Sequence, residues 1–259
     1  MSERLSSRRP VRGSDAAKLH KWAILFMTAG IIGRCILQNA LLGMNTLTVE
    51  ELLAAMEGTP GSMVILTVAL MCEITETCAV PLLSFLLVEG YQRTSGFEKY
   101  LARVGALALI SELPYNLAME GKLLHLGSRN PVFALVIALV MLHFFGRFAE
   151  KGLKNTVMKV LIFAAAFLWC RMLRIDHGIF VVIFVGILWF VRKKSNLRAM
   201  FAFSAAMICT LFDRFYIGAC LATILLHSYN EERGEPNRLF HYAVYPVLLL
   251  LTGIAAKFL

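Results

Sequence analysis

The feature that most constrains this chain is a succession of apolar runs, each of which ends at charged residues. A helix that crosses a bilayer needs about 20 mostly apolar residues, because every backbone N–H and C=O must find its partner inside its own segment. Hydrophobic residues make up 58% of the 259 residues and the mean hydropathy is +0.68, which exceeds the needs of one soluble core. Nine runs qualify, some of them short: 22–42, 61–90, 101–117, 131–148, 157–170, 179–191, 199–211, 215–226 and 240–259. We therefore predict an all-α, polytopic transmembrane helical bundle of about nine spans.

The distribution of Lys and Arg predicts the orientation of this bundle. Cytoplasmic loops are enriched in these residues, and a nine-span topology with a cytoplasmic N-terminus places 19 of the 26 inside and 6 outside. Residues 1–21 then form a basic cytoplasmic tail, and residues 22–259 form the transmembrane domain, whose partner is the lipid bilayer. The formal charge of +9 is explained by orientation, so nucleic acid is not an expected partner.

The first predicted loop and the apolar run that follows it carry sequence signals for local structure. In the first predicted outside loop, 43–60, Thr48 followed three residues later by Glu51 predicts the capping box of a short interfacial helix. The following run, 61–90, is long and contains Pro81, so it is either one kinked helix or a broken pair. The six cysteines show no CxxC spacing, which predicts reduced thiols and no metal site.

Ionisable residues at membrane depth are costly and are therefore candidates for a functional site. Two interpretations apply to them: they pair to join helices, as Arg34 would with Glu73 or Glu76, or several of them line a substrate cavity. The candidates are Arg34, Glu73, Glu76, Glu89, Glu112 and the cluster Arg171, Arg174, Asp176 and His177.

The residues after Pro81 go beyond what helix packing requires. The segments 81–94, 100–103, 110–117, 130–133, 176–178, 229–234 and 242–246 resemble, in order, the conserved blocks of the TraX family of membrane proteins, named for the acetylase of conjugative pilin. The blocks from 81 to 117 match at Pro81, Phe85, Glu89, Gly90, Thr94, Tyr100, Arg103, Ser111, Glu112, Pro114, Asn116 and Leu117.

The resemblance implies acyl transfer in the bacterial cytoplasmic (inner) membrane, from acetyl-CoA to pilin or another envelope acceptor. Such a reaction needs a general base, and His177 suits this role if a carboxylate orients it. Adjacent side chains diverge on a helix, so we expect Glu112 from another helix, not Asp176, to orient His177. The predicted catalytic residues are Glu89, Glu112, Asp176 and His177, and Arg93, Lys99 and Arg103 are predicted to bind the CoA diphosphate, although positive-inside loops place basic residues there anyway.

The chain also departs from the pattern that it resembles. The first apolar run has Gly30 and Ile31 where relatives have an Asp-His pair, and Glu76-Thr77 stands where Gly-Arg is usual. The segment 245–249 lacks the expected histidine. Two alternatives to an acyltransferase are therefore a catalytically inactive membrane scaffold in envelope or pilus assembly and a small-molecule transporter, although no inverted repeat is evident.

Overall fold

The computed structural model describes residues 13–45, 47–48, 50–51, 60–125, 127–234 and 238–259. In this part of the chain the regular elements are helices, and two isolated β-bridges, Ser14 with Tyr229 and Arg129 with Ile175, join extended segments. The predicted all-α class is confirmed, and each predicted apolar run corresponds to helix. Residues 1–12 of the predicted tail lie outside the described part.

The regular elements are named here in chain order. They are α1 (Ala16–Ile31) with its π-helical continuation η1 (Ile32–Leu41), α3 (Pro60–Thr77), α4 (Ala79–Arg93), α5 (Phe97–Glu120), α6 (Val132–Arg147), α7 (Leu153–Met172), α8 (Gly178–Val191), α9 (Ser195–Phe212), the 3-10 turn η2 (Arg214–Ile217), α10 (Ala219–His227) and α11 (Arg238–Ala255).

Local sequence signals explain several helix ends. The Asp15 carboxylate accepts a bond from the backbone N–H of Lys18 at 2.7 Å and so caps α1. Gly121 ends α5 in the left-handed region, with φ 67°, and its N–H bonds to the Leu117 carbonyl. The predicted capping box is present, since Thr48 Oγ1 and N both bond to the Glu51 carboxylate. The helix that it would start, 52–59, lies outside the described residues.

The long run 61–90 is a broken pair. α3 ends at Thr77 and α4 begins at Ala79, and Pro81 lies in the first turn of α4, where a missing N–H removes no helical hydrogen bond. At this break, Thr77 Oγ1 donates to the carbonyl of Phe215 at 3.1 Å, which ties the end of α3 to η2. The alternative left open by the sequence is thereby decided.

Four helical segments among the described residues are long and apolar enough to cross a membrane: Ala16–Leu41, Gly61–Arg93, Leu153–Met172 and Ser195–Phe212. Shorter apolar helices are Val132–Arg147, Gly178–Val191, Arg214–His227 and Tyr242–Ala255. The chain therefore has the helices of a membrane protein. Nine spans and a cytoplasmic N-terminus remain predictions.

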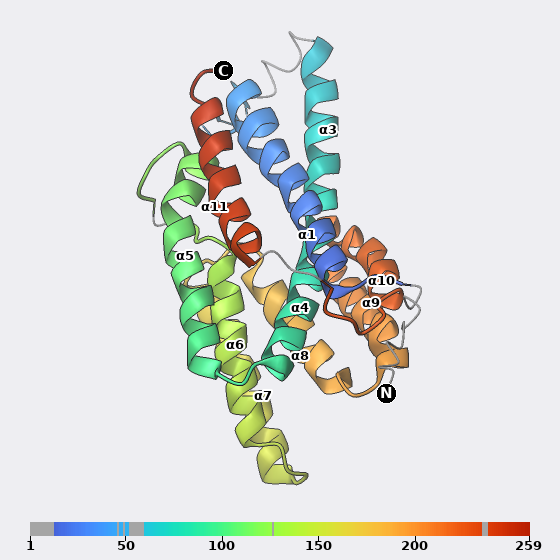
Figure 1. Cartoon of the computed structure of the whole chain (residues 1–259). Helices are drawn as coiled ribbons and strands as arrows, with labels where there is room; N and C mark the ends of the chain where they lie inside the picture. Colours follow the sequence, from blue (N-terminus) through green and yellow to red (C-terminus); the bar gives the residue numbers. More distant parts are fainter. Residues whose placement is uncertain (1–12, 46, 49, 52–59, 126, 235–237) are drawn as a thin grey trace, which may run out of the picture.

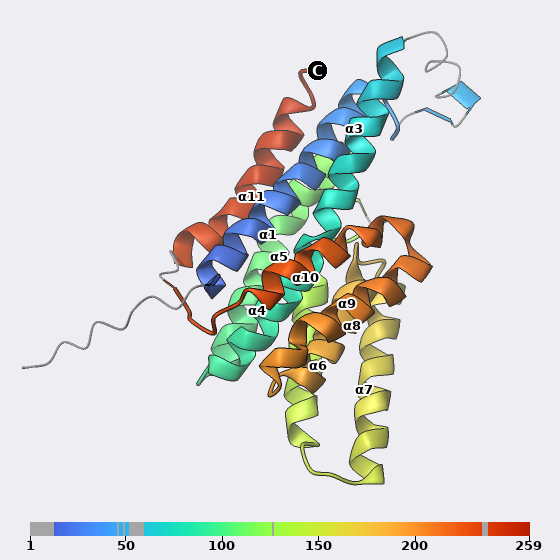
Figure 2. The same cartoon turned by 90° about the vertical axis from the view of Figure 1, so that its right-hand side faces the viewer.

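The helices form two connected groups (Figure 1). In one, α1 lies between α3 and α11, and α11 packs along α5. In the other, α8 is surrounded by α4, α6, α7 and α9, and α6 and α7 form a hairpin that projects beyond the rest (Figure 2). Because α4 follows α3 directly and packs on both α1 and α8, it joins the two groups.

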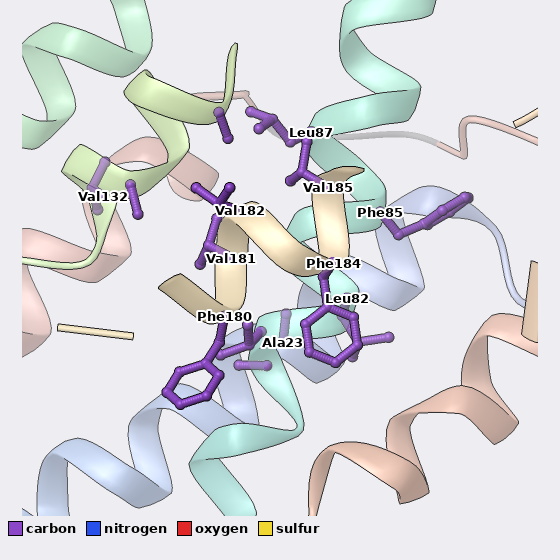
Figure 3. Close-up of a cluster of buried hydrophobic side chains, with 14 of the residues drawn as sticks. Ala23, Leu82, Phe85, Leu87, Val132, Phe180, Val181, Val182, Phe184 and Val185 are labelled. Carbon is purple, nitrogen blue, oxygen red and sulfur yellow. The ribbon is translucent and has the colours of Figure 1, made fainter. Parts of the chain in front are cut away.

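The apolar core is centred on α8. Its side chains Phe184, Val182 and Val185 are fully buried, and they meet Leu82 of α4 and neighbours from α1 and α6 (Figure 3). By contrast, α7 buries only Ala166 and Cys170. A helix that is apolar and exposed on most of its surface is stable in lipid, not in water. The contrast fits a bundle whose outer helices face a bilayer.

Candidate functional site

Four of the ionisable residues expected at membrane depth meet where the two helix groups join. Arg34 comes from η1, Glu76 from the last turn of α3, and Asp176 and His177 from the turn between α7 and α8. Arg34 bridges the others: its Nη1 lies 2.6 Å from Asp176 Oδ2, and its Nη2 lies 2.8 Å from Glu76 Oε2 and 2.9 Å from His177 Nε2. These four residues are called the Arg34 cluster below.

Backbone geometry presents Arg34 and His177 to each other. The helix that carries Arg34 widens from α to π just before it, and π segments inside α-helices occur frequently at functional sites. His177 has φ 54° and Arg174 has φ 51°, which are uncommon left-handed conformations for residues other than glycine. Such strained residues persist only where surrounding contacts hold them.

The contacts of His177 define its tautomer. Because an arginine N–H can only donate, Nε2 accepts from Arg34, and the neutral ring carries its proton on Nδ1. Nδ1 then donates to the hydroxyl of Tyr216, 2.7 Å away in η2. Glu76 Oε1 and Asp176 Oδ1 each lie 3.9 Å from Nε2, so this nitrogen faces two carboxylates as well as the guanidinium.

The cluster carries an excess of negative charge. One arginine lies between two carboxylates, so the formal charges leave one negative charge in excess when His177 Nε2 accepts from Arg34. The Tyr115 hydroxyl donates to Asp176 Oδ2 at 3.1 Å and so contributes no compensating charge. The side chains are 9 to 23% exposed, and charges this far from water attract a cation strongly.

Space for the Glu76 carboxylate is made by a glycine. A Cβ atom added at Gly30 of α1 would overlap the Cβ, Cδ and Oε2 atoms of Glu76. The residue that replaces the aspartate expected on the first helix is therefore the one against which Glu76 packs. Gly33, one turn further along the chain, approaches Cys72 of α3 in the same way.

The structure does not bring Glu112 to His177. Glu112 Oε1 pairs instead with Arg129 Nη1 at 3.0 Å, and Oε2 accepts from the backbone N–H of Asn130 at 3.2 Å. The Asn130 side chain bonds in turn to the Ala108 carbonyl and the Val132 N–H. Glu112 thus fastens the start of α6 to α5, and the carboxylates that face His177 are Glu76 and Asp176.

The remaining predicted residues lie at the other end of α4. Glu89 forms an ion pair with Arg93 one turn later and accepts from the Tyr229 hydroxyl at 3.0 Å. Arg93 also donates to the Glu231 carbonyl at 2.8 Å. Lys99 and Arg103 are exposed in the first two turns of α5.

A cavity of about 490 Å³ lies at this end of α4 and is bounded by α1, α4, α5, α6 and α11. Glu89, Arg93 and Arg103 line it, and the buried side chain of Tyr245 lines it as well. Tyr115 and Tyr216, which bond to Asp176 and His177 of the Arg34 cluster, are not predicted from the sequence, because nothing in the sequence distinguishes a tyrosine that bonds to a charged group from one that packs in a core.

The comparisons with known proteins agree on one family. The family model described as TraX protein matches residues 17–255. The chain is also similar to a protein described as probable fimbrial assembly protein FimC, serogroup H1, of Dichelobacter nodosus, with 28% identity over 204 residues that cover 70% of this chain and 80% of that protein. No solved structure matches the chain significantly.

Proposed function

Because the chain belongs to the TraX family and is related to a fimbrial assembly protein, we propose that it transfers an acyl group from a CoA thioester to an amine of a pilin or another envelope acceptor. The donor expected from the family resemblance is acetyl-CoA. The Arg34 cluster carries the proposal, since it sets a neutral histidine among carboxylates from different helices.

The excess negative charge of the cluster suits an amine acceptor. An amine is protonated at neutral pH and cannot attack a carbonyl until it loses a proton. The uncompensated charge near Glu76 and Asp176 attracts the ammonium group, which competes with Arg34 for the carboxylates and for His177 Nε2. Freed from Arg34, the Nε2 lone pair is available to accept a proton.

The reaction then balances without a metal. His177 Nε2 first takes a proton from the ammonium group and releases it to water. The neutral amine nitrogen then attacks the thioester carbonyl carbon, the C–N bond forms and the C–S bond breaks, and His177 takes the second proton that the nitrogen loses. This second proton passes to the leaving thiolate, which departs as CoA-SH. Tyr216, bonded to Nδ1, holds the ring in the orientation that this transfer requires.

The test is acceptor-dependent release of CoA by the purified protein in lipid nanodiscs, with acetyl-CoA and a peptide that has a free α-amino group. We expect His177→Ala to lower the rate by about 10²- to 10⁴-fold, the usual contribution of a general base. His227→Ala, which removes an exposed histidine at the end of α10, is the matched control and should leave the rate unchanged.

One observation favours the second candidate, an inactive scaffold for envelope or pilus assembly: the first helix has Gly30 and Ile31 where the family carries its Asp-His pair. A scaffold would release no CoA at any acceptor concentration. Equal rates for wild type and His177→Ala would reject the base assignment, and no release by wild type would favour the scaffold.

The location follows from the same family membership. We propose the bacterial cytoplasmic membrane, with the N-terminus in the cytoplasm, which is supported by the distribution of Lys and Arg among the predicted loops. In this orientation the cavity mouth at Arg103 faces the compartment that holds CoA. A cysteine introduced at Ser95 in that mouth should react with an impermeant maleimide only in inverted vesicles, and reaction in intact cells would reverse the orientation.

A further inference from the structure

The cavity between the helices is elongated. On α1 its lining extends from Ala16 to Met27, which is about 16 Å of helix at 1.5 Å per residue. On α4 it extends from Arg93 back to Leu83. The cavity is therefore a furrow that leads from the end of the bundle at which α4 ends and α5 begins toward its interior.

The outer end of the furrow is cationic. Arg103 and Arg233 line it, and within the described residues neither has a carboxylate partner. Arg103 Nε donates to the Lys99 carbonyl at 3.1 Å, which leaves its two terminal nitrogens without a described protein acceptor. Arg93, in the same mouth, is already neutralised by Glu89. The two arginines that remain suit phosphate groups.

The walls of the furrow are aliphatic on one side and carry hydroxyls on the other. Leu86 and Leu107 represent the aliphatic side, whereas Tyr242 and Tyr245 lie three residues apart on one face of α11. Tyrosine hydroxyls spaced along an apolar wall suit a linear ligand in which short alkyl pieces alternate with amides.

The inner end of the furrow lies next to the Arg34 cluster. Met27 lines it and is one turn before Gly30, against which Glu76 packs. Tyr245, 6% exposed, also lines the furrow, and its helix α11 contacts η1, the element that carries Arg34. A ligand that fills the furrow from its mouth therefore brings its far end to the cluster.

We propose that the furrow is the binding site of a CoA thioester, with the phosphates at Arg103 and Arg233, the pantetheine arm along Tyr242 and Tyr245, and the acyl group beside the Arg34 cluster. This inference rests on the proposed function. Of the three residues expected from the sequence to bind phosphate, it keeps Arg103; Arg233 takes the place of Arg93, which is paired with Glu89, and of Lys99, which does not line the cavity.

Calorimetry in nanodiscs of neutral lipid tests the furrow with two probes, CoA and the isolated nucleotide half of CoA. We expect CoA to bind at least tenfold more tightly than the nucleotide half, because only CoA carries the arm. Leu107→Trp, which fills the furrow, should reduce the affinity for CoA to that of the nucleotide half. Leu109→Trp on the same helix points outward, with 68% of Leu109 exposed, and should leave binding unchanged.

A second measurement remains informative if Leu107→Trp unfolds the protein. CoA should slow maleimide labelling of Leu107→Cys at least tenfold and leave the labelling of Leu109→Cys unchanged. Equal labelling rates with and without CoA would overturn the proposal that the furrow binds CoA. Protection of Leu107→Cys by anionic phosphatidylglycerol alone would also overturn it and would identify a lipid site.

The outcomes separate the two proposals. Binding of CoA by wild type that is insensitive to Leu107→Trp, with an unprotected Leu107→Cys, overturns the furrow and leaves the acyltransfer proposal in place. Absence of CoA binding to folded wild type overturns both. The double variant Arg103→Ala, Arg233→Ala should bind CoA at least tenfold more weakly. Its affinity for the nucleotide half should fall by a similar factor, since both probes carry the phosphates.

Discussion

Two of the arginine–carboxylate sites among the described residues, those of Arg129 and Arg34, differ in how many partners the arginine has. At the first, Arg129 faces Glu112 alone, and the second oxygen of Glu112 accepts a backbone N–H. At the second, Arg34 is shared by two carboxylates and a histidine nitrogen. A closed pair joins helices; a cluster with surplus charge and a neutral base is equipped to receive a ligand. Burial of charge alone does not distinguish the two.

The largest expected effect on stability separates the two sites by removing each arginine. Arg34→Met leaves Glu76 and Asp176 buried without a counter-charge, and breaking a buried pair costs about 3–5 kcal/mol. Arg129→Met should cost less, because Arg129 is 34% exposed and Glu112 keeps its bond to Asn130. The measurement is thermal unfolding in one detergent. An equal loss of stability in both variants would contradict the distinction between the Arg129–Glu112 pair and the Arg34 cluster.

The second effect tests the packing of Gly30 against Glu76. Gly30→Ala should destabilise by about 1–3 kcal/mol, because its Cβ overlaps the glutamate side chain and forces a shift. Gly105→Ala on α5, where a Cβ meets nothing within 4 Å, is the matched control and should be neutral or slightly stabilising.

The pairing of Gly30 with Glu76 is confirmed only if the two substitutions interact. In a double-mutant cycle, Glu76→Ala should recover part of the loss caused by Gly30→Ala, since it removes the overlapping Cδ and Oε2 atoms and keeps only the Cβ. Additive effects would show that the strain lies elsewhere.

The third effect concerns the hydroxyl that holds His177. Tyr216→Phe keeps the ring that packs on Phe180 but removes the partner of Nδ1. A hydrogen bond of this kind contributes about 1 kcal/mol, so acyl transfer should fall about fivefold with little change in the KM for acetyl-CoA. A proportional rise in KM without change in kcat would assign Tyr216 to binding instead.

The smallest effect is expected at the closed site. Glu112→Gln keeps an oxygen for Asn130 and a shape that fits beside Arg129, so the rate of acyl transfer should change by less than about twofold. Glu76→Gln, the same change at the Arg34 cluster, should lower the rate more strongly, because it removes the charge that attracts the amine. An equal loss of rate in the two variants would indicate that Glu112 takes part in acyl transfer.

Much of the fold follows from the cost of exposing backbone to lipid. Every predicted apolar run is helix, and the pairing of Arg34 with Glu76 was one of two alternatives that the cost of buried charge allows. The break at Thr77 could not be predicted, because a proline is tolerated both in a kink and in a first turn.

The partner of His177 depends on which helices are neighbours, and local patterns do not contain that information. Glu112 was a reasonable expectation from its helix and depth, yet α5 presents it to Arg129 on the following loop. Tyr216 was missed because a buried tyrosine in an apolar segment is ordinary. Glu89 matched a conserved block, and its place at the mouth of the cavity follows from the length of α4 beyond the break.

The hydrogen bond from Arg34 to His177 Nε2 also affects whether the acyl donor would be hydrolysed by water. A base with a free lone pair beside a thioester would activate water and hydrolyse the donor whenever no acceptor is present. While the guanidinium donates to that lone pair, the proposed enzyme would not hydrolyse its acyl-CoA donor. In the proposed mechanism, a cation that competes for the same carboxylates displaces the guanidinium, so the arriving amine both supplies the nucleophile and frees the base.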